Sequence, residues 1–250
     1  MRSRLAVENH RGVLVPRTLG LWLAGAATTS TIAVAAVQPD GPVERAGWGA
    51  LAATLLVFAA GMVDDLVGSG PRGIRNHARA LGAGHVSTGI LKLVVVVGAA
   101  SVAVTLQPTR SGAVRLAGVV LVAGCANIWN GLDVRPGRAL RFGLVAMVGL
   151  VGIDLALLPT VPLVALGSAL VVWADTRERA MLGDGGANLL GTTIGLGLYV
   201  VLADWAVVTG AAVAVALNVV AETITFSHAI DAIAPLRWFD RLGRLPDQKT

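Results

Sequence analysis

The sequence predicts an all-α integral membrane protein, a polytopic bundle of about eight transmembrane helices. Of its 250 residues, 55% are hydrophobic and 14% are charged, and the mean hydropathy is +0.73. These values are unusual for a soluble domain. The apolar runs approach the ~20 residues that a spanning helix needs, whereas barrel strands would give short alternating runs. The whole chain, 1–250, is expected to form a single membrane domain.

Eight apolar segments follow one another along the chain. They are predicted as spans at roughly 19–38, 48–64, 88–107, 112–130, 140–158, 160–175, 188–203 and 205–222, with a cytoplasmic tail over 223–250. Only Leu158-Pro159-Thr160 separates the fifth span from the sixth, and the last two divide near Asp204. The many small residues in these segments would let helices approach one another closely.

Basic residues are distributed unevenly between the two sides of this predicted bundle. Eight spans place both termini on one side, which holds 17 of the 20 Lys and Arg residues, while the other side holds Arg45, Arg110 and Arg115. By the positive-inside rule the termini are cytoplasmic, and the protein is expected to be a multi-pass protein of the plasma membrane. Topology thus accounts for the net charge of +5, and no nucleic-acid partner is expected.

The cysteine and histidine residues of this sequence form no pattern typical of a disulfide or a metal site. Cys125 stands alone in an apolar run, which excludes an internal disulfide and indicates a small core residue. The four histidines are isolated and lack the spacing of metal ligands. The first residues of the chain contain no apolar segment typical of a cleaved signal peptide, so none is expected.

Asp64 and Asp65 end the second predicted span. Carboxylates at a membrane boundary are costly unless they are solvated, paired or bound to a cation, so both are candidates for a functional site. Adjacent carboxylates also repel each other, and Mg²⁺ or a nearby Arg would relieve that repulsion. The alternative is that the two carboxylates simply form a solvated helix end.

Gly183-Asp184-Gly185-Gly186 precedes the seventh predicted span. Its glycines would let the backbone approach a phosphate, and its free amides would precede a helix N-terminus. The carboxylate of Asp184 could ligate Mg²⁺. A plain Gly-rich turn would look much the same.

Asn127, Asn130 and Asp133 recur at intervals of three residues, so a helix would place them on one face. Their donors and acceptors suit the edge of a base or a sugar. Arg135 and Arg138 follow and are placed to meet phosphates. Hydrogen bonding between helices, followed by ordinary cytoplasmic arginines, would explain the same residues.

Two further basic features lie on the predicted cytoplasmic side. Lys92 stands near the start of the third span, at its cytoplasmic end, where snorkelling of the side chain to the membrane surface is a sufficient explanation for a charged residue. The run from Pro235 to Arg244 adds Arg237 and Arg241. All these polar groups are expected to meet at the cytoplasmic face, since loops on a rigid scaffold usually carry the chemistry.

The order of these signals is more specific than any one of them. Together with Asn9-x-Arg11-Gly12-x-x-x-Pro16 near the N-terminus, it resembles the polyprenyl-phosphate N-acetylhexosamine-1-phosphate transferase family. That family includes the enzyme that makes lipid I of peptidoglycan. The likeness extends from about Asn9 to Arg244, and removal of the outer two of the family's usual ten spans leaves eight.

The resemblance implies transfer of a sugar 1-phosphate from a UDP-sugar to a polyprenyl phosphate, with release of UMP, for cell-wall biogenesis. It also implies Mg²⁺ (or Mn²⁺) as cofactor, and a homodimer. Asp184 would ligate the metal with support from Asp64, and Asp64 and Asp65 would orient or deprotonate the lipid phosphate. The substrate-binding residues expected are Asn9, Arg11, Lys92, Asn127, Asn130, Asp133, Arg135, Arg138, Gly183, Gly185, Gly186, Arg237, Arg241 and Arg244.

The chain departs from the family pattern at several positions. Pro136 stands where a second Asp is usual, Met181 replaces an aromatic residue, and Gly185 and Ala187 replace residues that carry hydroxyls. The alternative hypothesis is therefore a non-catalytic, family-derived protein that binds a lipid-linked or nucleotide ligand or scaffolds envelope enzymes. A transporter is a third hypothesis, disfavoured because the carboxylates lie at one face and not at the midplane.

Overall fold

The computed structural model describes residues 6–9, 11–37, 43–67, 82, 87–108, 110–153 and 159–245. Most of the polar stretch between the second and third predicted spans lies outside the described residues. So do the predicted end of the fifth span and the tail beyond Leu245.

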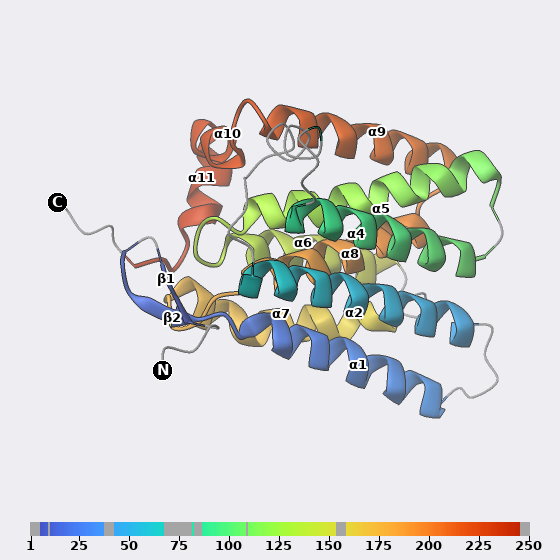
Figure 1. Cartoon of the computed structure of the whole chain (residues 1–250), viewed down its shortest axis with the longest axis horizontal. Helices are drawn as coiled ribbons and strands as arrows, with labels where there is room; N and C mark the ends of the chain where they lie inside the picture. Colours follow the sequence, from blue (N-terminus) through green and yellow to red (C-terminus); the bar gives the residue numbers. More distant parts are fainter. Residues whose placement is uncertain are drawn as a thin grey trace.

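Helices form most of the described chain, as predicted. The long helices are α1 (Leu19–Val37), α2 (Val43–Val67), α4 (Thr88–Leu106), α5 (Gly112–Leu132), α6 (Arg138–Ile153), α7 (Thr160–Thr176), α8 (Gly183–Val201) and α9 (Asp204–Ala221). The short elements are the strands β1 (Ala6–Glu8) and β2 (Leu14–Pro16) and the helices α10 (Phe226–Ala232) and α11 (Ala234–Arg241). The long helices run alongside one another, and the first and last described elements, β1 and α11, lie at the same end of the bundle (Figure 1).

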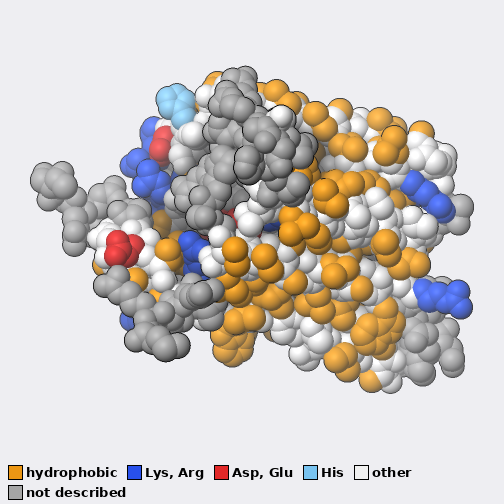
Figure 2. Space-filling view, in the orientation of Figure 1, with side chains coloured by type: hydrophobic (Ala, Val, Ile, Leu, Met, Phe, Trp, Pro, Cys, Tyr) orange, Lys and Arg blue, Asp and Glu red, His pale blue; other side chains and the backbone are white. Residues whose placement is uncertain are grey.

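Five of these helices, α1, α2, α4, α5 and α9, are long and apolar enough to cross a membrane. Helices α6 and α7 are shorter, at 16 and 17 residues, and α8 has 19 residues but does not reach the hydropathy of those five. Hydrophobic side chains cover the middle of the bundle, whereas charged side chains gather at its two ends (Figure 2). The chain is therefore a helical membrane protein.

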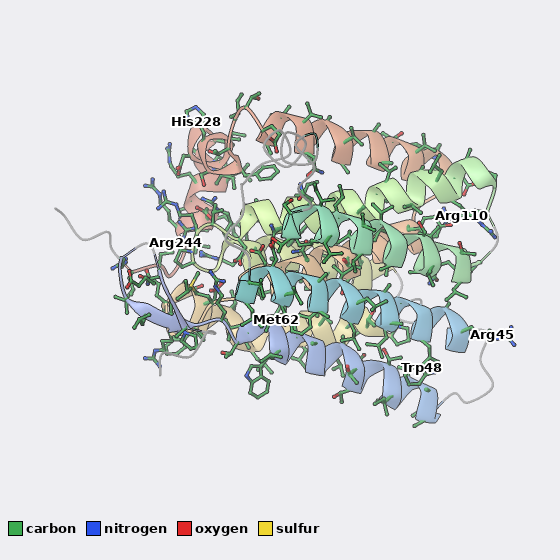
Figure 3. The ribbon with its side chains drawn as sticks, viewed as in Figure 1. Arg45, Trp48, Met62, Arg110, His228 and Arg244 are labelled. Carbon is green, nitrogen blue, oxygen red and sulfur yellow. The ribbon has the colours of Figure 1, made fainter. Side chains whose placement is uncertain are left out.

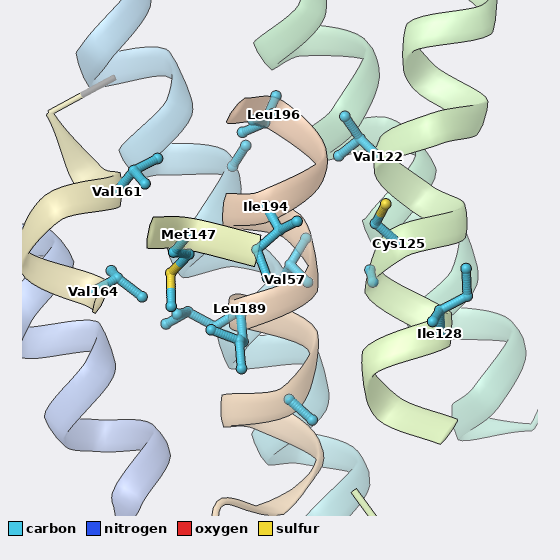
Figure 4. Packing of buried hydrophobic residues seen from close by; sticks show 14 of the residues in the cluster. Val57, Val122, Cys125, Ile128, Met147, Val161, Val164, Leu189, Ile194 and Leu196 are labelled. Atoms are coloured by element: carbon cyan, nitrogen blue, oxygen red, sulfur yellow. The ribbon is translucent and has the colours of Figure 1, made fainter. Parts of the chain in front are cut away.

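Helix α8 lies at the centre of the bundle and contacts α1, α2, α4, α5, α6 and α7. Every residue from Gly185 to Gly197 is buried. In Figure 4 its side chains Leu189, Ile194 and Leu196 lie among apolar residues of the surrounding helices, such as Val57 and Met147. A helix enclosed by other helices does not need a lipid-facing surface, which explains the modest hydropathy of α8.

Glycines bring the first turn of α8 against α1 and α2. A Cβ atom on Gly61 would lie 2.6 Å from Cα of Gly185, and one on Gly20 would lie 2.8 Å from Cα of Gly186. These helices can approach so closely only because all four residues lack a side chain. Gly185 and Gly186 are thus used for helix packing.

The predicted start of α8 at residue 188 was wrong, since the helix begins at Gly183 and the Gly-Asp-Gly-Gly motif forms its first turn. The first amides of a helix need acceptors from elsewhere. One is supplied by Asp65 of α2, whose Oδ2 accepts the N–H of Gly185 at 3.2 Å. The acidic Asp184 is also favoured in a first turn by the helix dipole.

The β-hairpin and the helices α10 and α11 were not predicted, although each has a local sequence signal. In the hairpin turn, Asn9 Oδ1 accepts the N–H groups of Arg11 and Val13, and Gly12 has φ 73°. Helix α10 is capped by the hydroxyl of Thr225, and α11 has a proline in its first turn. The segment that follows α9 is therefore folded as far as Leu242.

Candidate functional site

Three helix ends meet at one end of the bundle and bring charged side chains together. Asp64 and Asp65 lie near the end of α2, Lys92 near the start of α4, and Asp184 in the first turn of α8. The ammonium of Lys92 lies 2.7 Å from Oδ2 of Asp64 and 2.9 Å from Oδ2 of Asp184. One cation thus joins carboxylates from two helices that are far apart in the sequence. We call Asp64, Asp65, Lys92 and Asp184 the carboxylate cluster.

The polar side chains of this end are shown in Figure 3, where Met62 and Arg244 mark the end with the cluster and Arg45 and Arg110 mark the other. At that opposite end, Arg110 pairs with Asp204 at 3.1 Å and donates to the last carbonyls of α8. These contacts satisfy a helix C-terminus, which favours a cation.

Asp65 is held by two partners that differ from those of Asp64. Arg17 donates to its Oδ1 at 2.8 Å and to its backbone oxygen at 3.1 Å, while its Oδ2 accepts the amide of Gly185. A carboxylate near a helix C-terminus is disfavoured by the helix dipole, so it needs such partners. Asp65 therefore connects the entry to α1, the end of α2 and the start of α8.

The members of the cluster differ in their access to solvent. The side chain of Asp65 is 6% exposed, those of Lys92 and Asp64 are 14% and 18% exposed, and that of Asp184 is 38% exposed. A ligand arriving from solution would therefore reach Asp184 first. Asp65 is placed to position the turn that carries Asp184.

Asn127 and Asn130, which were predicted to share one face of α5, contact two different neighbouring helices. Asn130 accepts a hydrogen bond from Asn188 of α8 at 3.0 Å, and Asn188 also donates to the backbone oxygen of Asp184 at 2.6 Å. Asn127 instead donates to Asn218 of α9 at 2.5 Å and is exposed. The two side chains have different partners because α5 packs against both α8 and α9.

Asp133 follows α5 as its C-terminal cap, outside the apolar span. Burial raises the pKa of Asp133 well above its usual range, and the nearby carboxylates Asp175, Asp184 and Asp65 act in the same direction. A hydrogen bond from the backbone of Gly183 opposes this shift. A carboxyl group with a raised pKa holds its proton more readily, so Asp133 would add less repulsion to the cluster.

Asn9 and Arg11 attach the β-hairpin to the connection between α7 and α8. Both reach Glu178, Asn9 at 2.6 Å through Nδ2 and Arg11 at 3.0 Å through Nε. The backbone pairs as well, since the N–H of Met181 donates to the oxygen of Pro16 at 2.8 Å. These contacts hold the segment that leads into Gly183, which has φ 74°.

The predicted basic residues Arg138, Arg237, Arg241 and Arg244 divide into two groups. Arg138 and Arg244 both hydrogen-bond the carboxylate of Asp240, and the Arg138 and Asp240 side chains are each 1% exposed. By contrast, Arg237 and Arg241 contact Asp231, and Arg241 is 65% exposed. The first pair fixes α11 to α6, whereas of the second pair Arg241 points outward and Arg237 is partly buried. The remaining predicted residue, Arg135, is exposed between α5 and α6.

The cluster can be compared with the needs of a divalent cation. Asp64 and Asp184 converge on one position that is already taken by a positive charge, that of Lys92. The described part of the chain contains no group of three His, Cys, Asp or Glu residues able to hold a metal. Mg²⁺ usually binds through one or two carboxylates and completes its shell with water and substrate phosphates. The pair of carboxylates therefore fits Mg²⁺ if the Lys92 ammonium withdraws.

Arg17 and Asn188 are among the residues that contact the cluster but were not predicted as site residues. Arg17 carried a signal, because it is a cation that directly precedes the first span and could reach a carboxylate at the same face. Asn188 also carried one, since it lies four residues after Asp184 and would share its face of a helix. Because the helix was predicted to begin at residue 188, Asp184 and Asn188 were not expected to share a helical face.

Comparisons of the chain with models of protein families, with curated proteins and with solved structures find no match. The resemblance to the transferase family thus stays a prediction that depends on the order of motifs in the sequence.

Proposed function

We propose that this protein is a metal-dependent membrane transferase. It would move a sugar 1-phosphate from a UDP-sugar to a polyprenyl phosphate for the synthesis of a cell-envelope polymer, as a divergent, homodimeric member of the family that it resembles. The observation that supports this most is the single cation position shared by Asp64 and Asp184. Diphosphate substrates need such a position, because their charge has to be neutralised beside protein carboxylates.

The proposed topology has eight spans, with α6, α7 and α8 crossing the membrane in addition to the five most apolar helices. Support comes from the enclosed position of α8, which removes the need for an apolar surface. The uneven distribution of Lys and Arg supports cytoplasmic termini, with the cluster on the cytoplasmic face of the plasma membrane. A sugar nucleotide is made in the cytoplasm, so this orientation gives it access to Asp184.

In the proposed reaction, a phosphate oxygen of the lipid attacks the phosphorus that bears the sugar, and the bond from that phosphorus to UMP breaks. A Mg²⁺ or Mn²⁺ ion bound by Asp64 and Asp184 would neutralise charge on the diphosphate. Lys92, once separated from the two carboxylates, would donate its hydrogen bonds to a phosphate. Asp65 would keep the first turn of α8 in place through Arg17 and Gly185. Such positioning is the main contribution of the protein in phosphoryl transfer.

The experiment that tests this function uses the purified full chain with Mg²⁺, polyprenyl phosphate and a panel of UDP-sugars. We expect release of UMP that requires Mg²⁺ and is lost in Asp184→Asn. The matched control is Asp204→Asn, which removes a carboxylate at the opposite end of the bundle and should release UMP at the normal rate. Absence of turnover and of binding across the panel would rule out the proposal, as would full activity of Asp184→Asn.

A second candidate, a non-catalytic protein that binds a lipid phosphate or nucleotide, is favoured by one observation. Lys92 bridges both carboxylates, so the protein's own charge already offsets part of their repulsion. This candidate predicts tight binding of polyprenyl phosphate without turnover. It also predicts that Asp64→Asn leaves the cellular function of the protein intact.

A further inference from the structure

Helix α11 has one face held inside the protein and one face turned outward. On the inner face, Asp240 accepts hydrogen bonds from Nε and Nη2 of Arg138 at 2.8 and 2.9 Å and from Arg244 at 2.7 Å. Two residues earlier, Trp238 points to the opposite side, because successive helical residues turn by about 100°. Its side chain is 67% exposed. The buried ion pairs therefore fix which face of α11 is presented.

The outward face forms a shallow hollow of about 450 Å³, which we call the α11 hollow. It is lined by Arg237, Trp238, Arg241, Ala234, Leu242 and Gly243. Guanidinium groups match phosphate oxygens through paired N–H donors, and Trp is typical of the level where lipid headgroups meet hydrocarbon. The lining therefore suits a ligand in which a phosphate group is joined to an apolar portion.

Both guanidinium groups have N–H donors that no contact among residues 6–245 with described placement uses, and these donors are available to such a ligand. Arg237 uses Nη1 to donate to the backbone oxygen of Asp231 at 2.7 Å, and a guanidinium has five N–H donors in all. Arg241 lies 3.6 Å from the carboxylate of Asp231, with side chains 65% and 45% exposed. An exposed ion pair of this kind contributes little and is easily exchanged for another anion.

The position of the α11 hollow indicates which anion is nearby. Helix α9 is an apolar span that ends at Ala221, and α10 begins at Phe226, so little chain separates the membrane from α11. In Figure 1, α10 and α11 lie beyond the end of α9, at the end of the bundle that carries the β-hairpin. Lys and Arg side chains gather at this same end (Figure 2). The hollow therefore lies near the level of the lipid headgroups.

We propose that the α11 hollow binds the phosphate headgroup of an anionic phospholipid from the leaflet that surrounds this end of the bundle. The occupant follows from charge complementarity with Arg237 and Arg241 and from the exposed indole of Trp238, which would pack beside the glycerol and acyl region. This site does not depend on the transferase function.

The test measures lipid retention on the purified full chain by native mass spectrometry, with phosphatidylglycerol and phosphatidylcholine as probes. We expect selective retention of phosphatidylglycerol. The double variant Arg237→Gln/Arg241→Gln should bind it about thirtyfold more weakly, because each basic side chain near an anionic lipid contributes about a fivefold gain in affinity. The matched control Arg45→Gln/Arg177→Gln removes the same charge from exposed positions outside the hollow and should retain the lipid normally.

The proposal would be overturned by equal retention of both lipids, by normal retention in the double variant, or by an equal loss in the control. Stronger retention of polyprenyl monophosphate than of phosphatidylglycerol, lost in the same double variant, would assign the hollow to a lipid substrate and also overturn it. If the double variant does not fold, Arg241→Gln alone should weaken retention about fivefold, since its side chain is 65% exposed.

Discussion

The ammonium of Lys92 lies 2.9 Å from Oδ2 of Asp184, which connects the start of α4 to the first turn of α8. The same nitrogen lies 2.7 Å from Asp64, so the charge of Lys92 is shared between two carboxylates. Either carboxylate alone would be costly at the edge of a membrane. Lys92 therefore stabilises the cluster, and it occupies the position that a divalent cation would need.

Replacement of Lys92 should strengthen metal binding and weaken catalysis. In Lys92→Gln the two carboxylates lose their cation, so Mn²⁺ should bind at least about tenfold more tightly in the absence of substrate, the size expected for a charge-assisted hydrogen bond. Electron paramagnetic resonance of free Mn²⁺ measures this affinity directly. Arg110→Gln removes a cation at the opposite end and should leave the affinity unchanged. Equal or weaker Mn²⁺ binding by Lys92→Gln would show that Lys92 and the metal do not compete.

The pair formed by Arg17 and Asp65 should be strongly coupled. Their side chains are 24% and 6% exposed and lie 2.8 Å apart, so a double-mutant cycle with Arg17→Gln and Asp65→Asn should give a coupling free energy of about 1.5–3 kcal/mol. Thermal unfolding in detergent provides the four stabilities. The exposed pair Arg241 and Asp231 is the control and should give about 0–1 kcal/mol. A coupling free energy no larger than that of the control pair would contradict the positioning role of Asp65.

A methyl group at Gly61 should force α2 away from α8. Its Cβ atom would lie 2.6 Å from Cα of Gly185 and 2.7 Å from the backbone oxygen of Asp184, so Gly61→Ala should cost about 1–3 kcal/mol of unfolding free energy and disturb the cluster. Gly98 is the matched control, because a Cβ atom there meets nothing within 4 Å. Gly98→Ala should be neutral or stabilising by up to about 1 kcal/mol. Equal thermal stability of the two variants would contradict the close packing of α2 on α8.

The attachment of α11 should weaken in acid. Burial alone would raise the pKa of Asp240, but hydrogen bonds from Arg138 and the charges of Arg138, Arg244 and Arg141 lower it below its usual value. Asp240 thus stabilises the fold fully above the pKa that it has in the unfolded chain, and this contribution disappears as the pH falls through its lower, folded pKa. The measurement is the unfolding free energy of the native chain and of Asp240→Asn as a function of pH.

The difference between these two proteins should be constant from neutral pH to about pH 4 and should shrink below it. Asp231→Asn, at a carboxylate that is 45% exposed, should show little difference at any pH. A difference for Asp240→Asn that persists undiminished in strong acid would contradict the role of the ionised carboxylate.

The length and apolar composition of the spans were enough to predict the long helices. The segments predicted at 19–38, 88–107 and 112–130 correspond to α1, α4 and α5, because a membrane sets both the length and the composition of a helix that faces lipid. The start of α8 could not be predicted in this way. Its first turn is rich in glycine for packing against Gly20 and Gly61, and its cap comes from Asp65, which is distant in the sequence.

The candidate site was only partly predictable, because many of its contacts join residues that are distant in the sequence. Carboxylates next to apolar runs identified Asp64, Asp65 and Asp184, since charge at a membrane boundary is informative by itself. Helical spacing grouped Asn127 with Asn130, but the packing of α5 between α8 and α9 directs them to different partners. Spacing along one helix cannot tell which neighbour each side chain meets.

The central claim is that Asp64 and Asp184 hold a divalent cation, and a structure of the protein with Mn²⁺ and a UDP-sugar tests it most directly. Anomalous diffraction at the manganese edge would locate the metal independently of any assumption about the site. We expect a peak between the carboxylates of Asp64 and Asp184, with the ammonium of Lys92 displaced from both and directed at a phosphate. A peak elsewhere, or a saturated protein in which Lys92 still bridges the two carboxylates, would contradict this account.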